Sequence, residues 1–260
     1  MKKNTILVCG DIHGRRFWKE CREEIDNYDK VIFLGDYLDP YNFEFISVET
    51  AIENFKEIIE FKKNNMDKVI LLLGNHDMPY YSDIYYKFST YHCRHSREYH
   101  NVISDLFAKN HDLFQIAYYC DDVIFTHAGI EHKWLEDYVG CHEKDIDKIC
   151  DTLNHLVDNE KGLLRLFCIT SARGGRDRYG SCIWSDVNDM MWDIDYMHGH
   201  ESSSPIFKFK QVFGHTIQAY YNEYRKIVFG KAIEFDNCKM IDTSDIYVLD
   251  TKSFTIKKLK

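Results

Sequence analysis

The chain has 260 residues, 45% of them hydrophobic, which is enough to bury a substantial core. Its formal net charge of −9 argues against a general binder of nucleic-acid backbones, because such proteins normally present a basic surface. No apolar run approaches the length of a membrane span, and no Pro/Gly/Ser-rich linker divides the chain. We therefore expect a single domain over residues 1–260 with no membrane partner.

The nine cysteines are an odd number and form no C-x-x-C pair. This usage is typical of reduced, mostly buried thiols in an intracellular protein. We expect the protein to be cytoplasmic.

Five short apolar runs each end in polar residues that include a glycine. Each run has the composition of a buried strand, followed by a loop at its carboxyl end. The runs are Ile6 to Cys9 before GDIHG, Val31 to Leu34 before GDYLDP, Val69 to Leu73 before GNHD, Val123 to Phe125 before THAG, and Gln211 to Phe213 before GHT.

Helix-like segments lie between the early strands. Residues 45–59, with an apolar face that starts at Phe45, and residues 146–157 both have the spacing of an amphipathic helix. This alternation predicts a layered fold of the βαβ type. The last third offers only short strand candidates, in KIVFGKAI, KMIDTS, IYVLDT and FTIKKL, which predict a second and more antiparallel sheet.

The loops after the five runs carry the candidate site. Ligands of such folds bind at the carboxyl ends of the strands, so these loops should meet at one edge of the sheet. Their carboxylate, imidazole and amide groups suit two divalent ions such as Mn, Fe or Zn, whereas a structural zinc site would use thiolates. The side chains concerned are Asp11, His13, Asp36, Asp39, Asn75, His76, Asp77, His127 and His215.

The ordered series GDIHG, GDYLDP, GNHD, THAG and GHT resembles the calcineurin-like metallophosphoesterases. Within them it is similar to the branch of phosphoprotein phosphatases and bis-nucleoside tetraphosphatases. The motifs run from Gly10 to Thr216, which is most of the chain. The resemblance implies an α/β fold, a four-layer αββα sandwich with two mixed sheets and a dimetal site at the carboxyl ends of the strands.

The resemblance also implies a role for each motif residue. Asp11 and His13 would bind the first metal ion, and Asp36 would bridge both ions. Asn75, His127 and His215 would bind the second ion. His76 would be the general acid, and Asp39 the carboxylate that orients it.

The activity implied is hydrolysis of phosphomonoesters, as in the serine/threonine protein phosphatases, by a hydroxide that bridges the two ions. A hydrolase of dinucleoside polyphosphates is the alternative, because it shares the metal site and differs in the surrounding pocket. An inactive binding protein on the same fold is the third reading, against which the retained His76 and Asp39 argue. The nuclease branch usually ends in G-H-x-H, whereas Ile217 follows Thr216 here.

The sequence departs from the protein phosphatases after Asp39. Where they continue with Arg-Gly, this chain has Pro40 and Tyr41, so the arginine that grips phosphate is missing there. We expect Arg173 and Arg176, in SARGGRDRYG, to bind substrate instead. They lie within residues 131–205, which we expect to be an insertion that shapes the pocket for a phosphorylated substrate.

Overall fold

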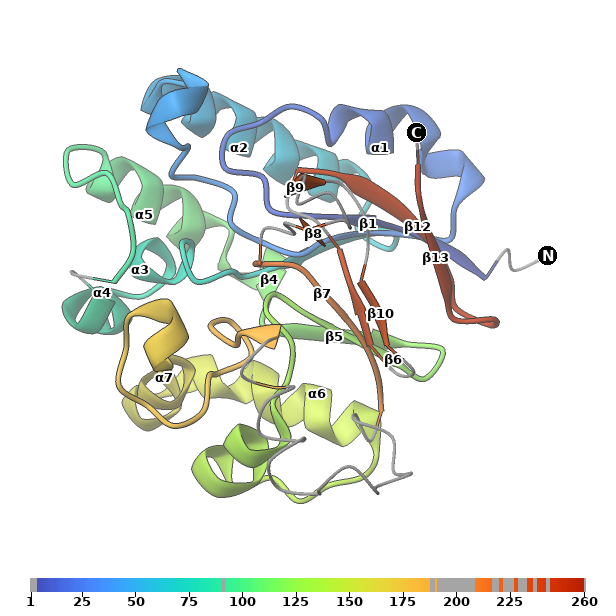
Figure 1. Ribbon diagram of the computed structural model, residues 1–260. Helices are drawn as coiled ribbons and strands as arrows, with labels where there is room; N and C mark the ends of the chain where they lie inside the picture. The colour runs from blue at the N-terminus through green and yellow to red at the C-terminus, as the bar shows by residue number, and fades with distance from the viewer. Residues whose placement is uncertain are drawn as a thin grey trace.

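The computed structural model describes residues 4–89, 92–187, 190, 209–216, 220–221, 227–228, 233–235, 238–241 and 244–259. Two mixed sheets pack against each other, and helices cover their outer faces (Figure 1). A separate antiparallel pair is formed by β8 (Tyr220–Tyr221) and β9 (Ile227–Val228). Among the described helices, none combines the length and the apolar character needed to cross a membrane.

The first sheet has six strands in the order β13-β12-β1-β2-β3-β4. Its strands β1 to β4 are parallel, whereas β12 and β13 add an antiparallel edge. The C-terminal strand pair was expected in the second sheet, and this expectation is wrong. The whole of β1 pairs with β12, so the pair completes the edge that β1 would otherwise expose. The strands are β1 (Thr5–Cys9), β2 (Lys30–Phe33), β3 (Val69–Leu72), β4 (Phe114–Gln115), β12 (Ile246–Asp250) and β13 (Thr255–Lys258).

The second sheet has five strands in the order β10-β11-β7-β6-β5. Strand β7 lies parallel to both β6 and β11, and antiparallel pairs close the two edges. All five runs expected to be strands are therefore confirmed, three in the first sheet and two here. The strands are β5 (Ala117–Cys120), β6 (Val123–Thr126), β7 (Lys210–Phe213), β10 (Ile233–Phe235) and β11 (Cys238–Met240).

Alternate residues of the central strands face opposite layers. Leu7 and Phe33 belong to the core that also contains Phe55 of helix α2 (Val48–Asn64). Their neighbours Val8 and Ile32 belong to a separate core shared with the second sheet. Because side chains alternate along a strand, the order of layers is helix, sheet, sheet, helix, as expected.

Helix α2 covers the first sheet (Figure 1). The side chain of Ser47 caps its N-terminus by accepting from the backbone N–H of Thr50 at 3.2 Å. The expectation that Phe45 lies on the buried face is wrong. Phe45 precedes the cap, has a positive φ of 55°, and is 94% exposed, so the helical spacing extends past the residue where the helix begins.

The remaining helices are short. Helix α6 packs on the second sheet and ends at Asn154, where a 3-10 turn replaces the helix expected up to residue 157. The α-helices are α1 (Lys19–Glu24), α3 (Met78–Tyr81), α4 (Asp83–Ser89), α5 (His100–Lys109), α6 (Ile146–Asn154) and α7 (Glu160–Leu166). The other helical turns are Ile25–Asn27, Asn42–Glu44, His111–Leu113, Trp134–Val139, His155–Asp158 and Ser171–Arg173.

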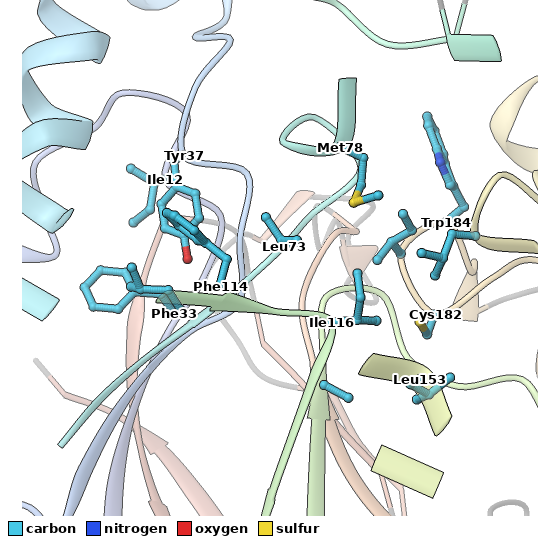
Figure 2. Close-up of a cluster of buried hydrophobic side chains, with 14 of the residues drawn as sticks. Ile12, Phe33, Tyr37, Leu73, Met78, Phe114, Ile116, Leu153, Cys182 and Trp184 are labelled. Atoms are coloured by element: carbon cyan, nitrogen blue, oxygen red, sulfur yellow. The ribbon is translucent and has the colours of Figure 1, made fainter. Parts of the chain in front are cut away.

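One apolar cluster joins the first sheet to the segment expected to be an insertion. It extends from Phe33 past Leu73 and Ile116 to Cys182 and Trp184 (Figure 2). Leu73 is the residue immediately before GNHD, so this core holds the base of that loop. Of the expected insertion, residues 188–189 and 191–205 lie outside the described residues.

Candidate functional site

The loops after β1, β2, β3, β6 and β7 meet at the carboxyl edge of the two sheets. Ligand atoms of His13, Asp36 and His76 lie within 4.8 Å of one another, and so do those of Asp36, His127 and His215. Asp36 belongs to both groups. A carboxylate shared in this way is able to contribute one oxygen to each of two neighbouring ions.

Asp36 is fixed by the GNHD loop. Its Oδ1 accepts from the backbone N–H of His76 at 2.9 Å, and its own N–H donates to Asp77 Oδ2 at 2.7 Å. Gly74 permits this approach, because a Cβ there would lie 2.1 Å from Asp36 Oδ1. Burial raises the pKa of Asp36, but the surrounding imidazoles outweigh burial and hold this pKa below its usual value.

Asp11 and His13 follow β1, and both are buried. The Nδ1 atom of His13 donates to the carbonyl of Leu38 at 2.9 Å, which leaves the lone pair of Nε2 3.6 Å from Asp36 Oδ2. Burial lowers the pKa of His13 to about 3, and burial raises the pKa of Asp11 to about 6. Both shifts reflect groups that have lost water, and a bound cation would favour the charged carboxylate and the neutral imidazole.

His127 and Asn75 point acceptor atoms at each other. His127 Nδ1 donates to the carbonyl of Leu34 at 2.9 Å, so Nε2 of the neutral ring carries a lone pair. That Nε2 lies 3.0 Å from Asn75 Oδ1 and 3.0 Å from Nδ1 of His215. The other ring nitrogen of His215 is buried without a hydrogen-bond partner. These nitrogen and oxygen donors fit a divalent cation of the Mn, Fe or Zn type.

His76 lies against Asp39 on the other side of Asp36. Its Nδ1 is 3.1 Å from Asp39 Oδ2 and 3.1 Å from the carbonyl oxygen of Arg94. Both partners are acceptors, so Nδ1 carries the proton. Burial lowers the pKa of His76, but the carboxylates of Asp36 and Asp39 outweigh burial and raise this pKa above its ordinary value. The structure therefore brings the expected acid and its orienting carboxylate together.

Sequence reasoning placed Asp77 in this site without giving it a role, and it missed Tyr80. The carboxylate of Asp77 accepts from the backbone N–H groups of Asp36, Tyr37 and Gly74 at 2.7, 2.9 and 2.8 Å. Tyr80 donates from its hydroxyl to Asp39 Oδ1 at 2.6 Å. The only signal for Asp77 was its place in GNHD, and nothing in the sequence around Tyr80 pointed to Asp39.

The segment 93–96 was also missed. Cys93 donates from its thiol to the carbonyl of Asn75 at 3.3 Å, and the N–H of Ser96 donates to the hydroxyl of Tyr80 at 2.7 Å. The carbonyl of Arg94, between them, contacts His76. This segment therefore supports the GNHD loop and Tyr80 through three of its residues, and no local sequence pattern pointed to it.

The two expected substrate arginines differ. Arg173 Nε lies 3.0 Å from Asp186 Oδ2, and its terminal nitrogen donates to the hydroxyl of Thr216, next to His215. Arg173 is therefore close to the metal-ligand candidates, but a carboxylate already neutralises its charge. Arg176 is exposed and contacts none of the candidate ligands within the described residues. Its role in binding substrate stays a prediction.

Comparisons with known proteins place the chain in a family. The structure of a proposed diadenosine tetraphosphatase is 13% identical, with a TM-score of 0.42, and the match covers 98% of this chain and 92% of that protein. A metallophosphoesterase from Sphaerobacter thermophilus is 11% identical, with a TM-score of 0.43 and coverage of 98% and 88%. A search of curated proteins finds no match. The sequence profile of the calcineurin-like phosphoesterases matches residues 4–225, and the chain therefore belongs to this family of metal-dependent phosphoester hydrolases.

Proposed function

We propose that the protein is a phosphatase that hydrolyses phosphomonoesters, with two divalent ions held by the six candidate ligands. The observation that carries this proposal is the pair formed by His76 and Asp39 beside the shared carboxylate of Asp36. A protein that only bound phosphate would need cations, but it would have no use for an oriented proton donor. The six ligands are Asp11, His13, Asp36, Asn75, His127 and His215.

Two bound divalent ions would supply a nucleophile at neutral pH and neutralise charge on the phosphoryl oxygens. The protein's own contribution is the proton for the leaving group. Because Nδ1 of His76 is held by Asp39 and by the carbonyl of Arg94, Nε2 is the atom that can donate this proton. General acid catalysis of this kind is typically worth about 10²–10⁴-fold in rate.

The second carboxylate oxygen of Asp39 accepts from the Tyr80 hydroxyl at 2.6 Å. Asp39 is therefore fully engaged between Tyr80 and His76, and it fixes both the tautomer and the orientation of the imidazole. An alkoxide leaving group, such as the serine oxygen of a phosphoserine peptide, depends on this proton. The arrangement therefore favours alkyl phosphomonoesters as substrates.

Hydrolysis of dinucleoside polyphosphates is the second candidate function, and a stacked aromatic pair with one exposed ring favours it. The rings of Tyr41 and Phe43 are stacked with centroids 5.2 Å apart, and Phe43 is 71% exposed. The Tyr41 ring also lies 5.0 Å from that of His13, at the edge of the site. An exposed ring in this place offers a stacking surface for a nucleobase.

A substrate panel tests these two functions against each other. Purified protein is supplied in turn with Mn, Fe, Zn or Mg, and kcat/KM is measured for a phosphoserine peptide, p-nitrophenyl phosphate and diadenosine tetraphosphate. We expect hydrolysis of both monoesters, with the tetraphosphate the poorer substrate. A higher kcat/KM for the tetraphosphate would replace the first function by the second. Hydrolysis of none of them with any ion would instead indicate a binding protein.

A further inference from the structure

The guanidinium of Arg94 lies beside the candidate acid. Its central carbon is 3.9 Å from the centroid of the Tyr41 ring, and one terminal nitrogen donates to the backbone carbonyl of Asp39 at 3.3 Å. The carbonyl of Arg94 itself contacts Nδ1 of His76 at 3.1 Å. Side chain and backbone of this one residue therefore both contact the pair formed by His76 and Asp39.

Several contacts fix this position. Cys93 and Ser96, on either side of Arg94, are hydrogen-bonded to Asn75 and Tyr80. The Tyr41 ring is in turn packed edge-on against His13 at 5.0 Å. Arg94 is therefore not a freely moving surface side chain, because the ring below it and the backbone beside it are both part of the catalytic centre.

The charge of Arg94 has no carboxylate partner in the described part of the chain, which distinguishes it from the other arginines near the site. Arg15 pairs with Glu44 at 2.5 Å, and Arg173 pairs with Asp186 at 3.0 Å. Arg94 is exposed and donates one hydrogen bond to a neutral carbonyl. A guanidinium has five N–H donors in a planar fork that matches phosphate oxygens, and most of those of Arg94 are free for an anion.

We propose that Arg94 is a substrate-binding residue that donates to a non-bridging oxygen of the substrate's phosphate, and that Tyr41 is the positioning residue that holds it. The proposal rests on the proposed phosphatase function. It gives a reason for the Pro40-Tyr41 departure: the chain places an aromatic ring after Asp39 and supplies the cation from another segment. Arg173, whose charge is already compensated, has the smaller part in binding phosphate.

The test compares Arg94→Ala and Arg94→Lys with the matched control Arg97→Ala, which removes an exposed arginine three residues away. Hydrogen bonds to charged groups contribute roughly 1.5–3 kcal/mol, so Arg94→Ala should raise KM for a phosphomonoester and the dissociation constant of inorganic phosphate about 10–100-fold. Arg94→Lys should recover part of the loss, because lysine keeps the charge and loses the fork. Arg97→Ala should change neither constant.

Tyr41 is tested by a pair of substitutions. An exposed cation–π contact is worth about 0.5–1 kcal/mol, so Tyr41→Leu should weaken phosphate binding about 2–5-fold. Tyr41→Phe keeps the ring and should restore most of that loss. Equal effects of the two substitutions would show that the ring does not position Arg94.

The dissociation constant of inorganic phosphate is measured by calorimetry on metal-loaded protein, so it does not depend on turnover. Unchanged phosphate binding in Arg94→Ala overturns the inference. A shifted pH profile with unchanged phosphate binding also overturns it, because Arg94 would then act only on the proton affinity of His76. If the wild-type protein hydrolyses no phosphate ester, the proposed function fails, whereas the calorimetric comparison still decides whether Arg94 binds phosphate.

Discussion

The two sheets contribute to the site in different ways. The loops after β1 and β2 are joined by backbone hydrogen bonds, since the N–H groups of Ile12 and His13 both donate to the carbonyl of Asp36, at 3.1 and 2.7 Å. The loops of the second sheet reach the first through His127, which donates to the carbonyl of Leu34, and through His215, whose N–H donates to Asp11 Oδ1 at 3.2 Å. The loops of the first sheet therefore form a connected framework, and the loops of the second sheet add imidazoles to it.

This difference separates the proposed chemical roles. The loops of the first sheet hold the proposed proton donor, its orienting carboxylate and the shared Asp36. The loops of the second sheet offer His127 and His215, and Arg173 contacts Thr216 beside them. Several of these residues have backbone strain: His13, Asp36, Asp39 and His215 have positive φ values of 44°, 53°, 57° and 70°. Such conformations cost about 1–3 kcal/mol each and persist where surrounding contacts impose them. The two-ion site that we propose would be complete only when both sheets pack together.

The largest expected effect is that of Asp36→Asn, which acts on both candidate ion positions. We expect reduced metal occupancy at both positions, because a neutral amide with a single oxygen replaces the shared carboxylate. That oxygen can still accept from the N–H of His76. Metal ions contribute several kcal/mol to charge stabilisation in the transition state, so kcat should fall on the order of 10³-fold or more. Metal analysis after reconstitution checks this. Retention of one ion at full occupancy would show that Asp36 serves a single position.

Asp77→Ala tests the framework formed by the loops of the first sheet. The substitution leaves three backbone N–H groups without their acceptor, in a residue that is fully buried. Unsatisfied buried donors cost about 1–3 kcal/mol each, so the free energy of unfolding should fall by about 3 kcal/mol or more. Urea denaturation measures the change. Asp112→Ala, at a fully exposed position, is the control, and an equal effect of the two would contradict the role of Asp77.

Arg173→Ala should have the smallest effect of the three. It removes the ion pair with Asp186 near His215. We expect kcat/KM to fall less than about tenfold for every phosphate substrate. Metal content should be unchanged. Steady-state kinetics with the three panel substrates checks this, with Arg176→Ala as a partner variant of smaller effect. A larger loss than that of Arg94→Ala would reverse the order of importance given to the two arginines.

The five strands that carry the site could be predicted from the sequence, because each of them is an apolar run followed by a polar loop that contains a glycine. Parallel strands bring their carboxyl ends to one edge, so the candidate ligands could be grouped before any contact was known. The layers followed from the alternation of strands and helices. The placement of β12 and β13 could not be predicted in this way, because the pairing of β12 with β1 joins opposite ends of the chain.

The contacts between loops were equally hard to predict. Arg94 lies 55 residues from Asp39 in sequence, and no local pattern links them. Phe45 continues a helical spacing, yet the Ser47 cap begins the helix after it. In each case the decisive interaction is tertiary, whereas periodicity reports only on the residue's own segment.

The central claim is that His76 protonates the leaving group, and the dependence on leaving group tests it most directly. Measured as kcat on metal-loaded protein, His76→Asn should lower turnover of a phosphoserine peptide about 10²–10⁴-fold, because an alkoxide needs a proton to leave. Turnover of p-nitrophenyl phosphate should fall much less, because p-nitrophenolate is stable without one, and both ions should be retained. Asp39→Asn should also lower turnover of the peptide more than turnover of p-nitrophenyl phosphate, but both losses should be smaller than those of His76→Asn. Equal losses on the two substrates, or loss of an ion from the His76 variant, would contradict the claim.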